Sequence, residues 1–105
     1  LCMSRHREAF EDFAERAEER LGDSLKQLYL YGSVARGDQN EESDIDVYAV
    51  VESEEARRSV EELAFDISVE HSVFIVPIVK TVEEFEASKD SIFVDEVRRT
   101  GEAYV

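Results

Sequence analysis

The sequence predicts a small α/β domain of the α+β type, in which a mixed β-sheet of about three strands carries packed helices. Segments with apolar residues every three or four positions alternate with short runs of branched and aromatic residues, the patterns of amphipathic helices and of strands. The chain has 105 residues, 43% of them hydrophobic, which suits a single domain over residues 1–105. The link between the first two predicted strands is too short for a parallel crossover, so we expect them to be antiparallel neighbours.

The first predicted helix covers residues 4–20, and Gly22 is expected to end it. His6 lies on its apolar stripe and is expected at the edge of the core, without a partner that would indicate a metal or catalytic role. The stripe consists of Met3, His6, Phe10, Phe13, Ala17 and Leu21.

Two strands are predicted next, at Leu25–Tyr31 and Ile45–Val51. Between them, Ser33–Arg36 is expected to form a turn or short helix, and Gly37–Asn40 has loop composition. Successive strand residues face opposite ways, so the second strand has two faces. We expect Asp44, Asp46 and Tyr48 on one face and Ile45, Val47, Ala49 and Val51 on the other.

A second long helix is predicted from the N-cap Ser53 to about Glu70. Its apolar stripe consists of Ala56, Val60, Leu63, Ala64 and Ile67. The apolar run Val73–Val79 predicts a third strand. Pro77 cannot donate a ladder hydrogen bond, so this strand is expected at a sheet edge or to end near the proline.

Two short helices and a possible last strand complete the prediction. The first of these short helices is predicted to begin with a capping box at Thr81 and to end at about Ala87. The second helix covers Ser91–Arg99, stops at Gly101, and is expected to turn Ile92, Phe93 and Val97 inward. A terminal strand is expected at Ala103–Val105.

Composition excludes several classes of function. The net charge of −14 argues against direct binding to nucleic acid, which needs lysine and arginine to neutralise phosphates. Such an acidic, lysine-poor chain suggests a halophilic source with a high-salt cytoplasm, where screening removes self-repulsion. No apolar run is long enough to span a membrane, and we expect a soluble, cytoplasmic protein. Cys2 is the only cysteine, which excludes an internal disulfide.

Asp44 and Asp46 stand two residues apart where the second strand begins. Alternate strand residues share a face, so their positions lie roughly 6–7 Å apart along the chain. With no basic residue beside them the carboxylates repel each other, and a bound cation would relieve that repulsion. Hard oxygen ligands suit Mg²⁺ or Mn²⁺, whose shell is completed by water and substrate phosphates.

Gly32 and Ser33 lie where the first strand ends. Glycine lets the backbone approach a ligand closely, exposed N–H groups bind phosphate, and Ser33 adds a hydroxyl donor. Arg36, one turn further, has the charge to neutralise a phosphate. If the two strands pair, this cradle lies near the aspartates. Each feature also has an alternative without a function. Gly32-Ser33 would be an ordinary turn, Asp44 and Asp46 a solvated strand face, and Arg36 a surface arginine.

These residues resemble the signature of the polymerase-β nucleotidyltransferase superfamily. The match is Gly32-Ser33, ten intervening residues and Asp44-Ile45-Asp46-Val47, within a stretch from Leu28 to Val51 that is similar to its minimal, single-domain members. The resemblance implies metal-dependent transfer of a nucleoside monophosphate, most plausibly AMP from ATP, to a hydroxyl. It also implies that Asp44 and Asp46 are catalytic and bind the metal, and that the nucleotide contacts Gly32, Ser33, Arg36 and Ser43.

The resemblance also implies a partner and reveals a departure. Minimal members are often paired with a small helical HEPN-type protein in toxin–antitoxin modules, so we expect a protein acceptor. Active members usually carry a third carboxylate on a later strand, where this chain has Phe74. An alternative is therefore a non-catalytic binding or antitoxin subunit. A weaker alternative is an aminoglycoside-type small-molecule transferase, although such enzymes usually carry an added helical domain. The run Val73–Val79 also makes a homodimer possible.

Overall fold

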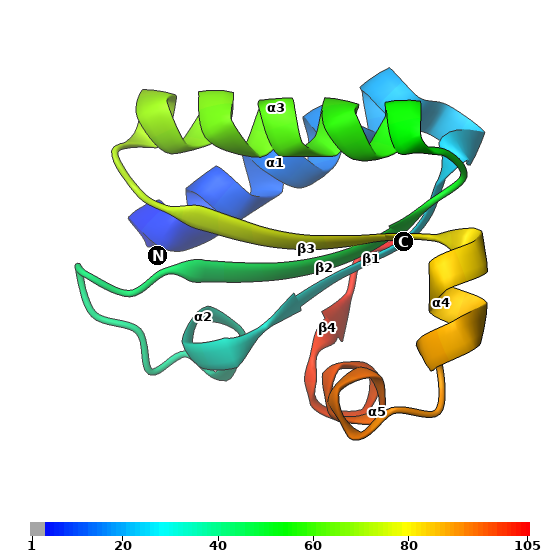
Figure 1. Ribbon diagram of the computed structural model, residues 1–105. Helices are drawn as coiled ribbons and strands as arrows, with labels where there is room; N and C mark the ends of the chain where they lie inside the picture. Colours follow the sequence, from blue (N-terminus) through cyan, green and yellow to red (C-terminus); the bar gives the residue numbers. More distant parts are fainter. Residues whose placement is uncertain (1–3) are drawn as a thin grey trace.

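The computed structural model describes residues 4–105 as a four-stranded mixed sheet with helices on both faces (Figure 1). The spatial order is β3-β2-β1-β4, so β3 is an edge strand, as expected. β1 is antiparallel to β2 and to β4, whereas β2 and β3 are parallel. The strands are β1 (Leu25–Tyr31), β2 (Ile45–Val51), β3 (Ile75–Thr81) and β4 (Glu102–Ala103).

The helices begin at residues that the sequence marks as caps. The Ser4 hydroxyl accepts a hydrogen bond from the Arg7 N–H at the start of α1, and the Ser53 hydroxyl accepts one from Ala56 at the start of α3. Thr81 forms the predicted capping box of α4. The helices are α1 (Arg5–Leu21), α2 (Gly32–Arg36), α3 (Glu54–His71), α4 (Val82–Ser88) and α5 (Ile92–Thr100), with a 3₁₀ turn η1 at Gly22–Ser24.

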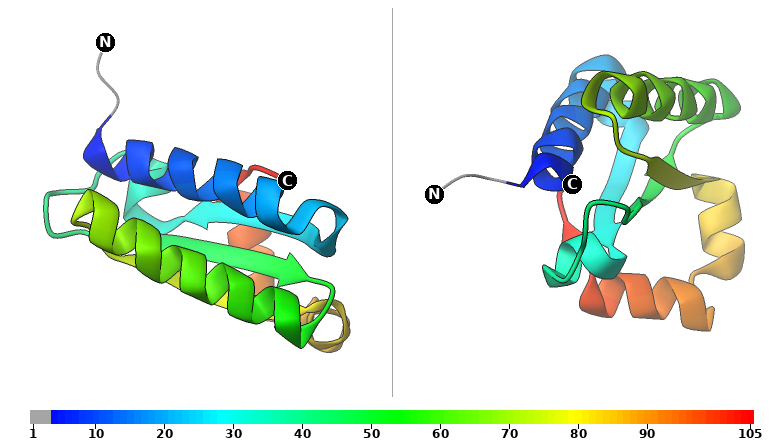
Figure 2. Two further views of the ribbon diagram at one scale, coloured as in Figure 1. Left: turned by 90° about the horizontal axis from the view of Figure 1, so that it is seen from above. Right: turned by 90° about the vertical axis from the view of Figure 1, so that its left-hand side faces the viewer.

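The main core lies between the sheet and the two long helices. α1 and α3 run side by side over one face of the sheet (Figures 1 and 2). The inward face of β2 packs there, with Ile45, Val47, Ala49 and Val51 all buried as predicted. Each buried Val or Ile side chain stabilises the fold by roughly 1.5–3 kcal/mol, so this layer anchors β2 at the centre of the sheet.

A second, smaller core lies on the opposite face, where α4 and α5 pack. Tyr48 and Val50 of β2 meet Phe85 of α4 and Val94 and Val97 of α5 there. Tyr48, which shares the face of the aspartates, is fully buried and therefore packs in this core. β2 is therefore covered on both faces along most of its length, and Asp46 lies where the cover of the second face ends.

Three details of the prediction are corrected. β3 starts at Ile75 rather than Val73, and it continues past Pro77 to Thr81 because an edge strand does not need the missing donor. Ile92 is 89% exposed, since the first turn of α5 points it away from the sheet, and Val94 takes the buried place. The last strand is Glu102–Ala103 rather than Ala103–Val105, and it adds a fourth strand to the expected three.

Two further observations complete the fold. Within residues 4–105, no helix is both long and apolar enough to cross a bilayer. Cys2 and Met3 of the sequence prediction lie outside the described residues.

Candidate functional site

The backbone of Gly32 lies directly against the carboxylate of Asp46. β1 and β2 pair so that Tyr31 is opposite Asp46, and the chain turns into α2 at the next residue. Gly32 has φ +77°, and a Cβ placed on it would lie 2.3 Å from Asp46 Oδ2. Only glycine therefore fits there, both for its backbone conformation and for the space it leaves. The structure brings the two predicted halves of the site together.

The carboxylate of Asp46 is affected by burial and by the charges around it. The pKa of Asp46 is raised, first by burial and then by the negative charge of Asp44, while Arg36 acts in the opposite direction. Asp44 is exposed at the end of the loop before β2, and Asp46 is half-buried. Among residues 4–105, no basic side chain forms an ion pair with either carboxylate. The pair therefore has the charge and the oxygen donors that a divalent cation would balance.

Tyr31 borders the aspartates and was not among the predicted site residues. Burial, and then the charge of Asp46, raise the pKa of Tyr31 to about 12. The ring packs edge-on against Phe93, at 5.7 Å between ring centroids. Tyr31 therefore stays neutral and gives the carboxylate of Asp46 an apolar neighbour. Its place at the end of an aromatic strand, one residue before Gly32, was the available sequence signal.

Arg36 is close enough to affect Asp46, although its own ion pair is with another residue. Its Nε lies 3.3 Å from Oδ2 of Asp38, and both side chains are more than 60% exposed. An exposed pair of this kind is worth at most about 1 kcal/mol, so Arg36 is readily released. Ser33 is half-buried beside Gly32 in the first turn of α2.

The loop from residue 37 to residue 44 is held in place by its own hydrogen bonds and by α1. The Ser43 hydroxyl accepts a hydrogen bond of 2.9 Å from the Asn40 N–H, so it helps to close the loop. His6 Nε2 lies 3.0 Å from the Ser43 carbonyl oxygen, and His6 is buried. His6, which the sequence placed at the core edge, thus fixes the residue that precedes Asp44.

Neither residue opposite the aspartates is an acid. In the parallel pairing of β2 with β3, Asp46 lies beside Val76, and Phe74 precedes the strand next to Asp44. The Phe74 carbonyl accepts a hydrogen bond of 2.7 Å from the Ile45 N–H, while its side chain is 71% exposed. Across residues 4–105, no three acidic, histidine or cysteine side chains gather closely enough to hold a metal ion together. The two aspartates are the donors available at this edge.

Comparison with known proteins gives a consistent result. The family model described as "Nucleotidyltransferase domain" matches residues 10–100. A protein of Methanocaldococcus jannaschii named "Putative protein adenylyltransferase MJ0141" is 31% identical over 99 residues, which is 90% of this chain and 93% of the relative.

Solved structures share the fold. A toxin–antitoxin crystal structure determined with AMP-PNP superposes with a TM-score of 0.60, at 21% identity, over 89% of this chain and 70% of the other. A mutant of the MntA–HpeT toxin–antitoxin superposes with a TM-score of 0.59, at 19% identity, with the same coverage.

Proposed function

This chain belongs to the nucleotidyltransferase domain family, and we propose that it transfers AMP from ATP to a hydroxyl group on a partner protein. The observation that carries the proposal is the contact between the Gly32 backbone and the Asp46 carboxylate. It supports a site in which phosphates on the turn and a cation on the aspartates belong to one ligand. The high negative charge of the chain favours a protein over a nucleic acid as the acceptor.

Each predicted residue has a role in this proposal. Asp44 and Asp46 hold Mg²⁺ or Mn²⁺, which supplies positive charge beside the phosphates when bound. Gly32 and Ser33 receive the phosphates through backbone N–H groups and the hydroxyl. Arg36 leaves Asp38 to neutralise phosphate charge, and Ser43, which closes the loop, lines the nucleotide's approach.

The proposed reaction is a displacement at the α-phosphorus of ATP. The acceptor oxygen forms a bond to that phosphorus, the bond to the oxygen that bridges to the β-phosphate breaks, and pyrophosphate leaves. The proton of the acceptor hydroxyl passes to a base. Because Val76 and Phe74 stand where a third carboxylate would accept it, water or a group on the partner is the proposed base. We place the reaction in the cytoplasm, where ATP and Mg²⁺ are available.

A second candidate function rests on Val76 and Phe74, the two residues that stand opposite the aspartates. Without an acid opposite Asp44 and Asp46, the domain could bind nucleotide and a small helical partner of the HEPN type as an antitoxin without catalysing transfer. Toxin–antitoxin structures are among the proteins that share this fold, which makes a protein partner reasonable under either reading.

A labelling experiment separates the two functions. The full chain is incubated with Mg²⁺ and the product of the neighbouring gene, with ATP labelled at the α-phosphate in one arm and at the γ-phosphate in the other. Transfer of AMP predicts label on the partner from the α-phosphate alone, and its loss in Asp46→Asn. Asp23→Asn, a change to an exposed carboxylate of η1 at the opposite end of β1 from Gly32, serves as control and keeps activity. Partner binding without any label would favour the antitoxin function, and γ-label on the partner would refute nucleotidyl transfer.

A further inference from the structure

Three large apolar side chains stand exposed in a single groove. Phe65 and Val69 of α3 are 69% and 65% exposed, and Phe74 is 71% exposed. All three line a groove of about 750 Å³ between α3 and β3. A soluble domain rarely leaves such side chains together in water, and polar-rimmed patches of this kind mark interaction sites.

The groove is continuous with the candidate site. Ser43 and Asp44 line its other end, so a molecule bound over Phe65 and Phe74 reaches the first aspartate. Phe65 and Val69 are four positions apart on α3, which places them on one face of the helix. Neither is among the buried residues of α3, although the groove also reaches the buried residues Ala64 and Ser68.

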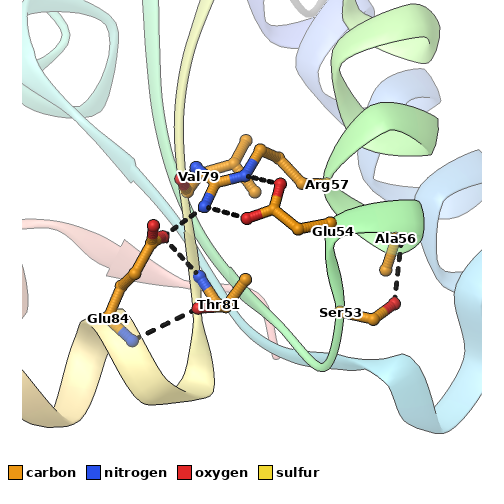
Figure 3. Close-up of polar contacts among 7 residues, drawn as sticks. All are labelled: Ser53, Glu54, Ala56, Arg57, Val79, Thr81 and Glu84. Carbon is orange, nitrogen blue, oxygen red and sulfur yellow. Dashed lines mark hydrogen bonds and ion pairs between the residues drawn. The ribbon is translucent and has the colours of Figure 1, made fainter.

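The edge of β3 is partly blocked against another strand, and Figure 3 shows two of the contacts that block it. Since the Phe74 carbonyl points to β2, the groups of every second residue from Ile75 onward point outward. The Ile75 N–H donates to the Ser68 hydroxyl, and Pro77 has no N–H. At Ile75 and Pro77, one of the two outward backbone groups is thus taken or missing, which weakens the edge as a template for strand addition.

The other two outward positions are occupied by side chains of α3 and α4. Arg57 donates a hydrogen bond of 2.5 Å to the Val79 carbonyl and also pairs with Glu54 and Glu84 (Figure 3). The Thr81 N–H donates to Glu84 at 3.0 Å. Strand addition is therefore disfavoured along this edge, and we expect an occupant of the groove to bind mainly through side chains.

The rim of the groove is acidic. It includes Glu41, Glu42, Asp44 and Glu61, and none of the residues within 4–105 that line it is basic. A second copy of this chain would bring the same acidic rim, and nucleic acid would bring phosphate, so both are repelled. The complementary occupant has apolar side chains flanked by lysine or arginine.

We propose that this groove docks an amphipathic, basic helix of a partner protein. Helices bind apolar grooves through residues at positions i, i+3, i+4 and i+7, and flanking cations would pair with the rim. Docking requires no catalysis. One further step rests on the proposed function: the docked protein is also the acceptor, and this contact brings it to Asp44.

The test uses a defined probe. A fluorescent helical peptide of about 18 residues carries leucines at helical spacing and lysines elsewhere. A scrambled peptide keeps the composition without the stripe, and a third peptide has glutamate for every lysine. Anisotropy with the full chain, at the lowest KCl concentration that keeps it folded by circular dichroism, is expected to show binding at least ten times tighter for the first peptide.

Matched variants locate the binding. Phe65→Ser and Phe74→Ser are expected to weaken it at least tenfold, and these exposed positions leave the fold intact. Ile92→Ser, at an even more exposed apolar residue on α5, is expected to change nothing. Asp46→Asn should also leave peptide binding unchanged while it abolishes nucleotide transfer, so failure of docking and failure of catalysis are distinguishable.

Three outcomes would overturn the proposal. Equal binding of the scrambled peptide would show charge attraction only. Equal loss in Ile92→Ser would place the binding elsewhere. A dimer in sedimentation equilibrium that Phe65→Ser dissociates would make the groove an interface between copies of this chain.

Discussion

Replacing Gly32 with alanine is expected to damage the site more than the fold. The new Cβ would lie 2.3 Å from Asp46 Oδ2, and ordinary contact begins at 3.4 Å. The carboxylate must retreat by about 1 Å, a displacement that can reduce catalysis about 100-fold. Alanine at φ +77° also costs roughly 1–2 kcal/mol of folding free energy, because its Cβ crowds the carbonyl.

Gly37 supplies a matched control. It has φ +78°, nearly the same as Gly32, yet nothing lies within 4 Å of a Cβ added there. Gly37→Ala therefore places an alanine at a similar positive φ without touching the aspartates. Urea denaturation measures the strain in both variants, and calorimetry with Mg²⁺ and ATP measures the site.

The expected result is a split between the two measurements. Both variants lose roughly 1–2 kcal/mol of stability, whereas only Gly32→Ala loses most of its Mg²⁺-dependent nucleotide binding. Equal nucleotide binding in the two variants would refute the argument that Gly32 is required for its contact with Asp46.

Three other perturbations test separate parts of the structure. The pKa of Asp46 in the folded protein is raised by burial and by the neighbouring carboxylate, so without metal the native state loses stability as the pH rises through that pKa. Asp46→Asn should therefore raise the urea midpoint at pH 7. This gain in stability should vanish as the pH falls below 3.8, the ordinary pKa of an aspartate. Arg57→Ala removes the hydrogen bond to the Val79 carbonyl at the β3 edge and should lower the free energy of unfolding by about 1–2 kcal/mol. It should also cause concentration-dependent association in sedimentation velocity. Arg99→Ala, which breaks an exposed ion pair on α5, should lower the free energy of unfolding by less than about 0.5 kcal/mol. His6→Ala should lower the free energy of unfolding by about 2 kcal/mol and should weaken nucleotide binding, because it frees the loop before the aspartates. His71→Ala breaks a contact between α1 and α3 and should affect stability alone.

Local patterns in the sequence predicted most of the fold. β1 and β2 have the predicted boundaries because each is an apolar run that ends at a glycine or begins after a polar loop. Ser53 and Thr81 cap helices as expected, since a cap depends on residues three positions apart. Ser4, predicted as the first residue of its helix, also acts as a cap.

Contacts between distant segments could not be predicted in this way. A terminal strand was expected, but its bounds at Glu102–Ala103 and its pairing with β1 were not, because two residues have too little pattern of their own to fix them. Arg57 reads as a surface residue of a helix, and only the fold reveals that it caps the Val79 carbonyl. The apolar run before Pro77 did not disclose which side chains face solvent.

The candidate site divides in the same way. The turn and the aspartates were visible because their spacing is short and their chemistry specific. His6 was missed as a loop anchor because the contact spans 37 residues. Phe65 and Val69 had a signal that was not used: two apolar residues four apart, outside the predicted stripe, on an otherwise polar helix face.

The central claim is that Asp44 and Asp46 bind a divalent cation together with the nucleotide. Isothermal titration of the full chain with a non-hydrolysable ATP analogue tests it, in Mg²⁺ and then in EDTA, for the native protein, Asp46→Asn and the control Asp23→Asn. We expect binding that requires Mg²⁺, survives Asp23→Asn and weakens at least ~10-fold in Asp46→Asn. Nucleotide binding of equal strength in EDTA, or in Asp46→Asn, would contradict the claim.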